Sequence, residues 1–147
     1  MPSVSVADTA AYLLGEWSIE RTVVDERSGA RGTFVGTALF RRVGGELLEV
    51  ESGDFVWGGI GNPATRTHRL VPHDDGTVDV LFADGRPFHH LDLRTGHWHT
   101  RHPCAADRYD GEFTVVSPDE WHLCWRVWGP AKTQLLTSVY RRGRRTA

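Results

Sequence analysis

The sequence predicts one all-β domain over residues 1–147, a single antiparallel up-and-down β-barrel of about ten strands with a short N-terminal helix. Three observations predict it. Turn-forming residues recur about every ten residues along the chain. The runs between them are rich in β-branched and aromatic side chains, which favour strands. Finally, Trp17 near the start can pair with Arg142 near the end, because a guanidinium stacked on an indole can close one mouth of a barrel.

The helix is expected over residues 6–14, and Gly15 would end it. Glycine, proline and aspartate clusters then separate the strands. We place turns at residues 26–29, 44–45, 58–63, 74–76, 84–85, 95–96, 118–120 and 129–130. The glycine-rich residues 58–61 lack the lysine of a phosphate-binding loop and do not open a helix, so we expect a mobile loop at the barrel rim.

Side chains alternate across a strand, so one face of each strand points into the barrel. In the first strand the inward residues would be Trp17, Ile19, Arg21 and Val23. The later strands would turn inward Phe34, Gly36, Ala38, Phe40, Val78, Val80, Phe82, His89, Leu91, Leu93, Trp98, Thr100, His102, Trp121, Leu123, Trp125, Val127, Leu136, Ser138, Tyr140 and Arg142.

The polar members of this inward set predict what the barrel holds. They are Arg21, Arg66, His68, His89, His102, Ser138, Tyr140 and Arg142, with Tyr109 beside them. No carboxylate is assigned to the interior, although the register around Glu49 and Glu51 is ambiguous. Because unpaired buried charge is costly, either water or an anionic or phenolic ligand would balance the cations.

The predicted ligand-binding residues combine this polar end with an aromatic wall: Arg21, Arg66, His68, His89, Trp98, His102, Trp125, Tyr140 and Arg142. Tyr140 and Arg142 share one face of the last strand and suit a carboxylate. Alternatively, Arg142 only covers Trp17. Phe88 would join the wall only if its strand is kinked, because strict alternation places it outside.

The histidine-rich residues 84–111 allow three interpretations. His97, His99 and His102 could bind a metal, but the first two are expected on the outer face, so we predict no metal site. His89 or His102, with Tyr109, could perform acid–base catalysis. The third interpretation is a set of surface and hydrogen-bonded histidines without catalytic function.

Several short sequence segments are similar to those of an uncharacterised bacterial domain family of lipocalin-like (calycin) barrels. They include residues 12–17 (YLLGEW), 84–89 (DGRPFH), 125–132 (WRVWGPAK) and 138–142 (SVYRR). The resemblance implies a lipocalin-like fold and a cytoplasmic setting, but no activity. The Leu-x-Gly-x-Trp opening is also similar to nitrobindin-like barrels, which hold haem through a histidine near the C-terminus. Here the last histidine is His122, expected outside. Fatty-acid-binding barrels use a similar Arg/Tyr pair on their last strand.

Composition limits the partners. Hydrophobic residues make up 39% of the chain, charged residues 24%, and the net charge is −2. We therefore expect neither nucleic acid nor a membrane as a partner. Residues 1–11 lack the pattern of a secretory signal, which favours the cytoplasm. A homodimer is left open.

The sequence predicts an intracellular barrel that binds a small anionic or phenolic molecule in a cationic, aromatic-lined cavity, without a cofactor. Two alternatives remain. One is a cofactor-independent isomerase, cyclase or lyase that uses His89, His102 or Tyr109. The other is a haem-binding, nitrobindin-like protein.

Overall fold

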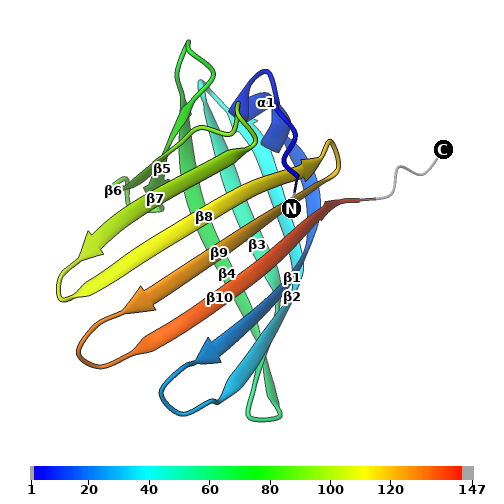
Figure 1. Ribbon diagram of the computed structural model, residues 1–147. Helices are drawn as coiled ribbons and strands as arrows, with labels where there is room; N and C mark the ends of the chain where they lie inside the picture. The colour runs from blue at the N-terminus through cyan, green and yellow to red at the C-terminus, as the bar shows by residue number, and fades with distance from the viewer. Residues whose placement is uncertain (1, 144–147) are drawn as a thin grey trace.

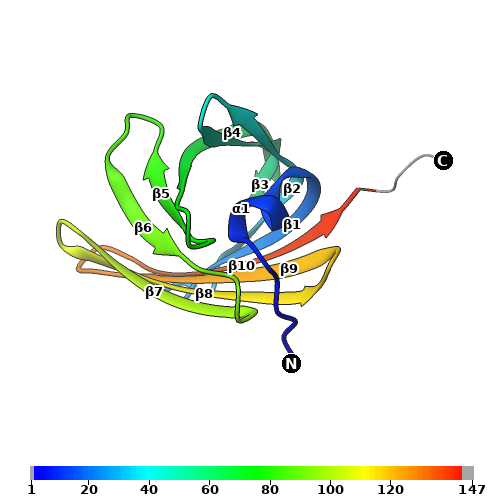
Figure 2. The same cartoon turned by 90° about the horizontal axis from the view of Figure 1, so that it is seen from above.

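The computed structural model describes residues 2–143, except the side chain of Cys104, and confirms the predicted fold class. A short helix precedes ten antiparallel strands that curl into a nearly closed barrel (Figures 1 and 2). The elements are α1 (Thr9–Leu13), β1 (Gly15–Asp25), β2 (Arg31–Val43), β3 (Glu46–Trp57), β4 (Ile60–Pro72), β5 (Val78–Phe82), β6 (Pro87–Leu91), β7 (His97–Cys104), β8 (Asp107–Ser117), β9 (Glu120–Trp128) and β10 (Thr133–Arg142). In this part of the chain no helix is long and apolar enough to cross a membrane.

The sheet is a meander whose first and last strands pair with each other in its middle. The strand order is β6-β5-β4-β3-β2-β1-β10-β9-β8-β7, so β6 and β7 form the two edges. These edges meet through a side chain: the Trp98 indole on β7 donates to the His90 carbonyl of β6 at 2.9 Å. We call this junction the β6–β7 seam.

Helix α1 lies over one end of the barrel (Figure 2), and aromatic and cationic side chains close that end. Trp17 is fully buried, and its indole donates to the Leu13 carbonyl at 2.8 Å. The Arg142 guanidinium lies 4.0 Å above the Trp17 ring and donates to the carbonyls of Tyr12 and Leu14. Trp17 and Arg142 therefore close one end of the barrel together.

The helix has only five residues, and both of its ends are marked by the sequence. The Asp8 side chain accepts a hydrogen bond from the Ala11 backbone at 2.8 Å. Gly15, with φ at +117°, ends the element and starts β1. The helix is thus shorter than the expected residues 6–14.

Two glycines bring β2 and β3 unusually close. Gly36 and Gly53 face each other in the strand register. A Cβ atom at either position would overlap the backbone of the opposite strand. Glycine is therefore required at both positions for steric reasons.

Two turn predictions need correction. Residues 58–61 do not form a rim loop: only Gly58 and Gly59 turn, and Pro63 already pairs with Asp54 in the ladder. Between β7 and β8 the chain turns at residues 105–106, where Ala105 has φ at +55°. Alanine rarely adopts that conformation, so composition does not mark this turn.

Candidate functional site

An ion-pair network lies inside the barrel, on β1, β3, β4 and β10. Glu51 is buried and accepts hydrogen bonds from both terminal nitrogens of Arg21, at 3.0 and 3.1 Å. The Tyr140 hydroxyl donates to the same carboxylate at 2.8 Å, and Arg66 Nη2 donates to it at 3.0 Å. Arg21 Nε also donates to the Ser138 hydroxyl at 2.7 Å. One carboxylate therefore fixes two guanidinium groups and a phenol.

The buried carboxylates correct the expectation of an interior with cations alone. Glu49 and Glu51 share the inward face of β3 with Leu47. Glu49 lies 3.2 Å from Nδ1 of His68 on the neighbouring strand. The expectation that no carboxylate lies in the interior was wrong, because a buried guanidinium requires a counter-charge and Glu51 provides it for Arg21.

Burial raises the pKa of each acidic group of the network, but the net change differs between neighbours. Burial alone would raise the pKa of Glu51, but the charge of Arg66 and the hydrogen bonds from Arg21 outweigh it and lower the pKa to about 2. Glu51 is therefore ionised at neutral pH. Burial raises the pKa of Glu49, and it raises the pKa of Tyr140 well above its ordinary value. Tyr140 thus acts as a neutral donor.

A β-bulge brings Phe88 into the barrel beside this network. In the β5–β6 ladder Val80 lies opposite His89 and Leu81 lies opposite Pro87, so Phe88 has no partner. An unpaired residue of this kind re-aims the side chains next to it. Phe88 and His89 consequently both line the internal cavity, although strict alternation would separate them.

Aromatic rings surround Phe88 and form one wall of the site. Phe88 stacks on Phe82 and on Trp125, with ring centroids 4.5 and 5.2 Å apart. Four further rings lie at centroid distances of 4.8 to 6.3 Å from Phe88: His68, His89, His102 and Tyr109. Burial lowers the pKa of His89 to about 4, so its imidazole is neutral at pH 7.

Two hollows meet at the ion-pair network. An internal cavity of about 40 Å³ has room for one or two water molecules. A cleft of about 230 Å³ shares Glu51 and Arg66 with this cavity. Phe34 and Phe55 also line the cleft. They lie near the β1–β2 and β3–β4 hairpins, and these hairpins are at the end of the barrel away from α1 (Figure 1). The site is therefore reached from the end opposite the Trp17 plug.

Trp121 lines the internal cavity and carries an unmet hydrogen-bond donor. Its indole Nε1 is the one buried side-chain nitrogen or oxygen without a hydrogen-bond partner among residues 2–143, Cys104 aside. Leaving a buried donor unpaired is costly. An acceptor atom within hydrogen-bonding distance of this nitrogen would satisfy it.

Comparison with known proteins identifies the family. A family model described as a family of unknown function, DUF6314, matches residues 13–142. The chain belongs to the DUF6314 family. No curated protein is similar in sequence to this DUF6314 chain.

Solved structures similar to the DUF6314 barrel confirm its architecture. An S-type phycobiliprotein lyase, CPES from Guillardia theta, is 10% identical with a TM-score of 0.68, covering 97% of this chain and 95% of that one. EF1p2_mFAP2b bound to DFHBI is 19% identical with a TM-score of 0.51, covering 95% and 100%. A fluorescence-activating β-barrel designed de novo is 16% identical with a TM-score of 0.50, covering 94% and 100%. At these identities the likeness concerns the fold.

The DUF6314 barrel gathers most of the predicted ligand-binding residues around the two hollows. Those lining them are Arg21, Arg66, His68, His89, Trp125 and Tyr140. The others lie elsewhere. His102 and Tyr109 border a separate hollow of about 480 Å³ with Trp128, Trp98 spans the β6–β7 seam, and Arg142 lies at the closed end.

The histidines of β7 do not converge on one point. His99 contacts Asp110, and His97 lies 3.5 Å from Glu112. His102 is on the opposite face of the strand, among the aromatic rings. His122 lies between the buried Trp121 and Leu123 on β9 and contacts Glu120 at 2.7 Å, on the outer face.

Sequence reasoning missed Glu49, Glu51 and Trp121 as site residues. The segment around the two glutamates has apolar residues on both faces of the strand, so alternation alone did not predict which face points inward. Trp121 was predicted to be inward, but nothing in the sequence marks its indole N–H as unpaired.

Proposed function

We propose that this DUF6314 protein binds a small planar aromatic molecule carrying one carboxylate or phenolate group. The observation that carries the proposal is an accessible guanidinium, that of Arg66, in a cleft that Phe34 and Phe55 also line. The Arg66 side chain is 43% exposed and uses Nη2 on Glu51. Arg21, in contrast, is buried and makes four hydrogen bonds. Arg66 is thus the guanidinium with donors left for a ligand.

The charges of the network favour an anion over a neutral ligand. Arg21 and Arg66 share one carboxylate, that of Glu51, so these three side chains together carry one positive charge in excess. Burial favours the protonated, neutral form of Glu49 next to them. An anionic ligand at Arg66 would balance the excess charge with a charge-assisted hydrogen bond.

The volume of the cleft and its aromatic side chains favour a small flat molecule. Pockets for drug-sized ligands usually measure about 300–1,000 Å³, and the cleft of about 230 Å³ is smaller. A one- or two-ring compound would lie in the cleft along Phe34 and Phe55, where contact between aromatic rings adds to burial. The likeness to EF1p2_mFAP2b, whose structure contains bound DFHBI, supports ligand binding by a barrel of this fold.

Calorimetric titration with 4-hydroxybenzoate and with its methyl ester tests the proposal. Arg66→Gln should weaken binding of the acid by about tenfold or more, because it removes a charged hydrogen bond, and should affect the ester little. Arg69→Gln is the matched control: Arg69 is similarly exposed and also pairs with a glutamate, Glu46, but outside the hollows. Equal weakening of both compounds, or no binding of either, would contradict the proposal.

A second candidate function, acid–base catalysis without a cofactor, rests on His89. Its Nδ1 lies 2.8 Å from the His90 carbonyl, so Nδ1 carries the proton and Nε2 keeps a free lone pair. A neutral imidazole with a free lone pair in a cavity can remove a proton next to a carbonyl group. His102 and Tyr109, whose ring centroids lie 5.1 and 6.3 Å from that of Phe88, would assist.

Proton exchange measures this second function directly. In D₂O the wild-type protein should speed deuterium exchange at the methylene group of 4-hydroxyphenylpyruvate, followed by NMR. His89→Gln should abolish the acceleration and His99→Gln, on the outer face, should keep it. The absence of any acceleration by the wild-type protein would exclude this chemistry for the probe and favour simple binding.

A further inference from the structure

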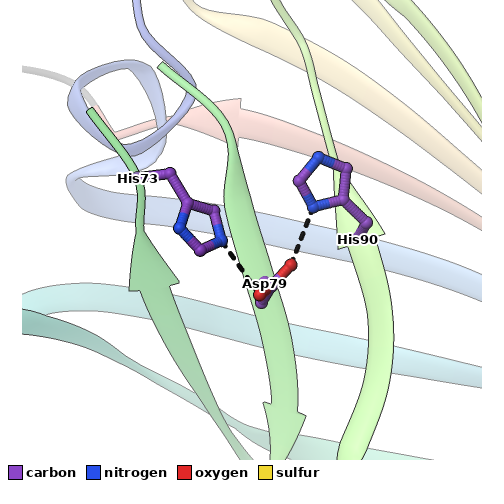
Figure 3. Close-up of side chains that lie close together, drawn as sticks. All are labelled: His73, Asp79 and His90. Carbon is purple, nitrogen blue, oxygen red and sulfur yellow. Dashed lines mark hydrogen bonds and ion pairs between the residues drawn. The ribbon is translucent and has the colours of Figure 1, made fainter. Parts of the chain in front are cut away.

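Three side chains outside the barrel converge on one point of its surface (Figure 3). His73 follows β4, Asp79 lies in β5, and His90 lies in β6, directly opposite Asp79 in the strand register. Nε2 of His73 is 2.9 Å from one oxygen of Asp79, and Nδ1 of His90 is 2.7 Å from the other. One ligand atom from each residue lies within 4.8 Å of those of the other two. These residues are separate from the hollows around Arg66.

We propose that His73, Asp79 and His90 form a binding site for a divalent transition-metal ion, specifically Zn²⁺. Two imidazole nitrogens and one carboxylate oxygen are a ligand set that zinc uses with a fourth, water-filled position. A metal–ligand distance of about 2.0–2.2 Å spaces neighbouring ligand atoms slightly wider than the present hydrogen bonds. The required movement is therefore small.

Exposure allows both the movement and the entry of the ion. The three side chains are 41–45% exposed, so they can rotate and a water ligand can reach the metal. An aspartate carboxylate is ordinarily ionised at neutral pH, the form in which it binds metals.

The surroundings hold His90 in place. Its backbone carbonyl accepts hydrogen bonds from the Trp98 indole and from Nδ1 of His89. The ring of Trp98 lies 5.8 Å from that of His90. Trp98 therefore both orients the ligand strand and places a fluorophore close to the proposed metal.

Zinc binding by the untagged, chelator-treated full chain tests the proposal. Calorimetric titration with ZnCl₂ should give one equivalent bound. Asp79→Asn and His90→Gln should each weaken binding by tenfold or more. His99→Gln is the matched control, since His99 also faces outward and pairs with one aspartate, Asp110, and it should bind zinc as the wild type does.

Two further readouts separate a site from misfolding or non-specific binding. Zinc in excess should raise the Tm of the wild type by about 5 °C. It should raise the Tm of the His73→Gln variant by less; His73 lies outside the strands, so its replacement leaves the sheet intact. Cu²⁺ should quench tryptophan fluorescence in the wild type and less in Trp98→Phe. Binding that survives in the His73→Gln/His90→Gln double variant, or an equal loss in His99→Gln, would overturn the assignment.

Discussion

Replacing Glu51 with glutamine tests whether the buried ion-pair network stabilises the barrel. Glutamine keeps the shape of the side chain but leaves the Arg21 guanidinium without its counter-charge. Lowering the pKa from 4.5 to about 2 corresponds to a stabilisation of about 3 kcal/mol at neutral pH. Removing one partner of a buried ion pair costs about 3–5 kcal/mol. We therefore expect Glu51→Gln to lower the free energy of unfolding by about 3 kcal/mol or more.

The pH dependence of this difference has a definite sign. Because the folded-state pKa is lower than the unfolded value, the stabilisation is complete above pH 4.5 and is lost as the pH falls towards 2. Urea unfolding of both proteins between pH 7 and pH 3 measures the difference. It should stay nearly constant from pH 7 to 5 and shrink by about 2 kcal/mol between pH 5 and pH 3.

Glu49→Gln is the matched control, because Glu49 is buried on the same face of β3. Its pKa is raised by burial, so folding favours the protonated form and ionisation at higher pH costs stability. We expect no loss of stability, or a gain, at pH 7. Equal destabilisation by both variants, or a difference between the wild type and Glu51→Gln that does not change with pH, would refute the reasoning.

Three further substitutions, and one control variant, test the fold. Gly36→Ala should lower the free energy of unfolding by about 3 kcal/mol or more, because the new Cβ overlaps the β3 backbone. Gly61→Ala is the control: its Cβ would meet only Val56, at 3.7 Å, so the free energy of unfolding should change by less than about 1 kcal/mol. Ala105→Gly should raise the Tm by about 2–3 °C in a thermal scan, because glycine adopts the positive φ of that turn without strain; a lower Tm would show that the turn is not strained. Arg142→Leu should lower the free energy of unfolding by about 1–2 kcal/mol, because it removes the stacking of Arg142 on Trp17 and the hydrogen bonds of the guanidinium. Calorimetry should give an unchanged Kd for 4-hydroxybenzoate, since Arg142 lies at the closed end.

The strands could be predicted because their signals are local. Alternation in β1 correctly placed Trp17, Ile19, Arg21 and Val23 inside, since each side chain's direction depends only on its own strand. The turn at residues 105–106 carried no such signal, because alanine there is held at a positive φ by the hairpin around it.

The site was harder to predict because it depends on contacts between distant strands. Glu51 is buried only because Arg21 and Tyr140, from β1 and β10, meet it there. Phe88 enters the wall through a bulge, whose extra residue is visible only in the pairing of β5 with β6. The proposed zinc ligands His73, Asp79 and His90 likewise come together through strand register, and their separation along the chain gave no familiar metal-binding motif.

The pairing of β1 with β10 has a consequence for synthesis of the protein. The ribosome makes β1 first and β10 last, yet these two strands are neighbours in the middle of the sheet. The nascent chain can form the β1–β6 meander early, but this half stays unsealed until the final strand has emerged. A premature stop before β10 would therefore not trim an edge of the barrel; it would divide the sheet at its centre and expose the core of the newly made half.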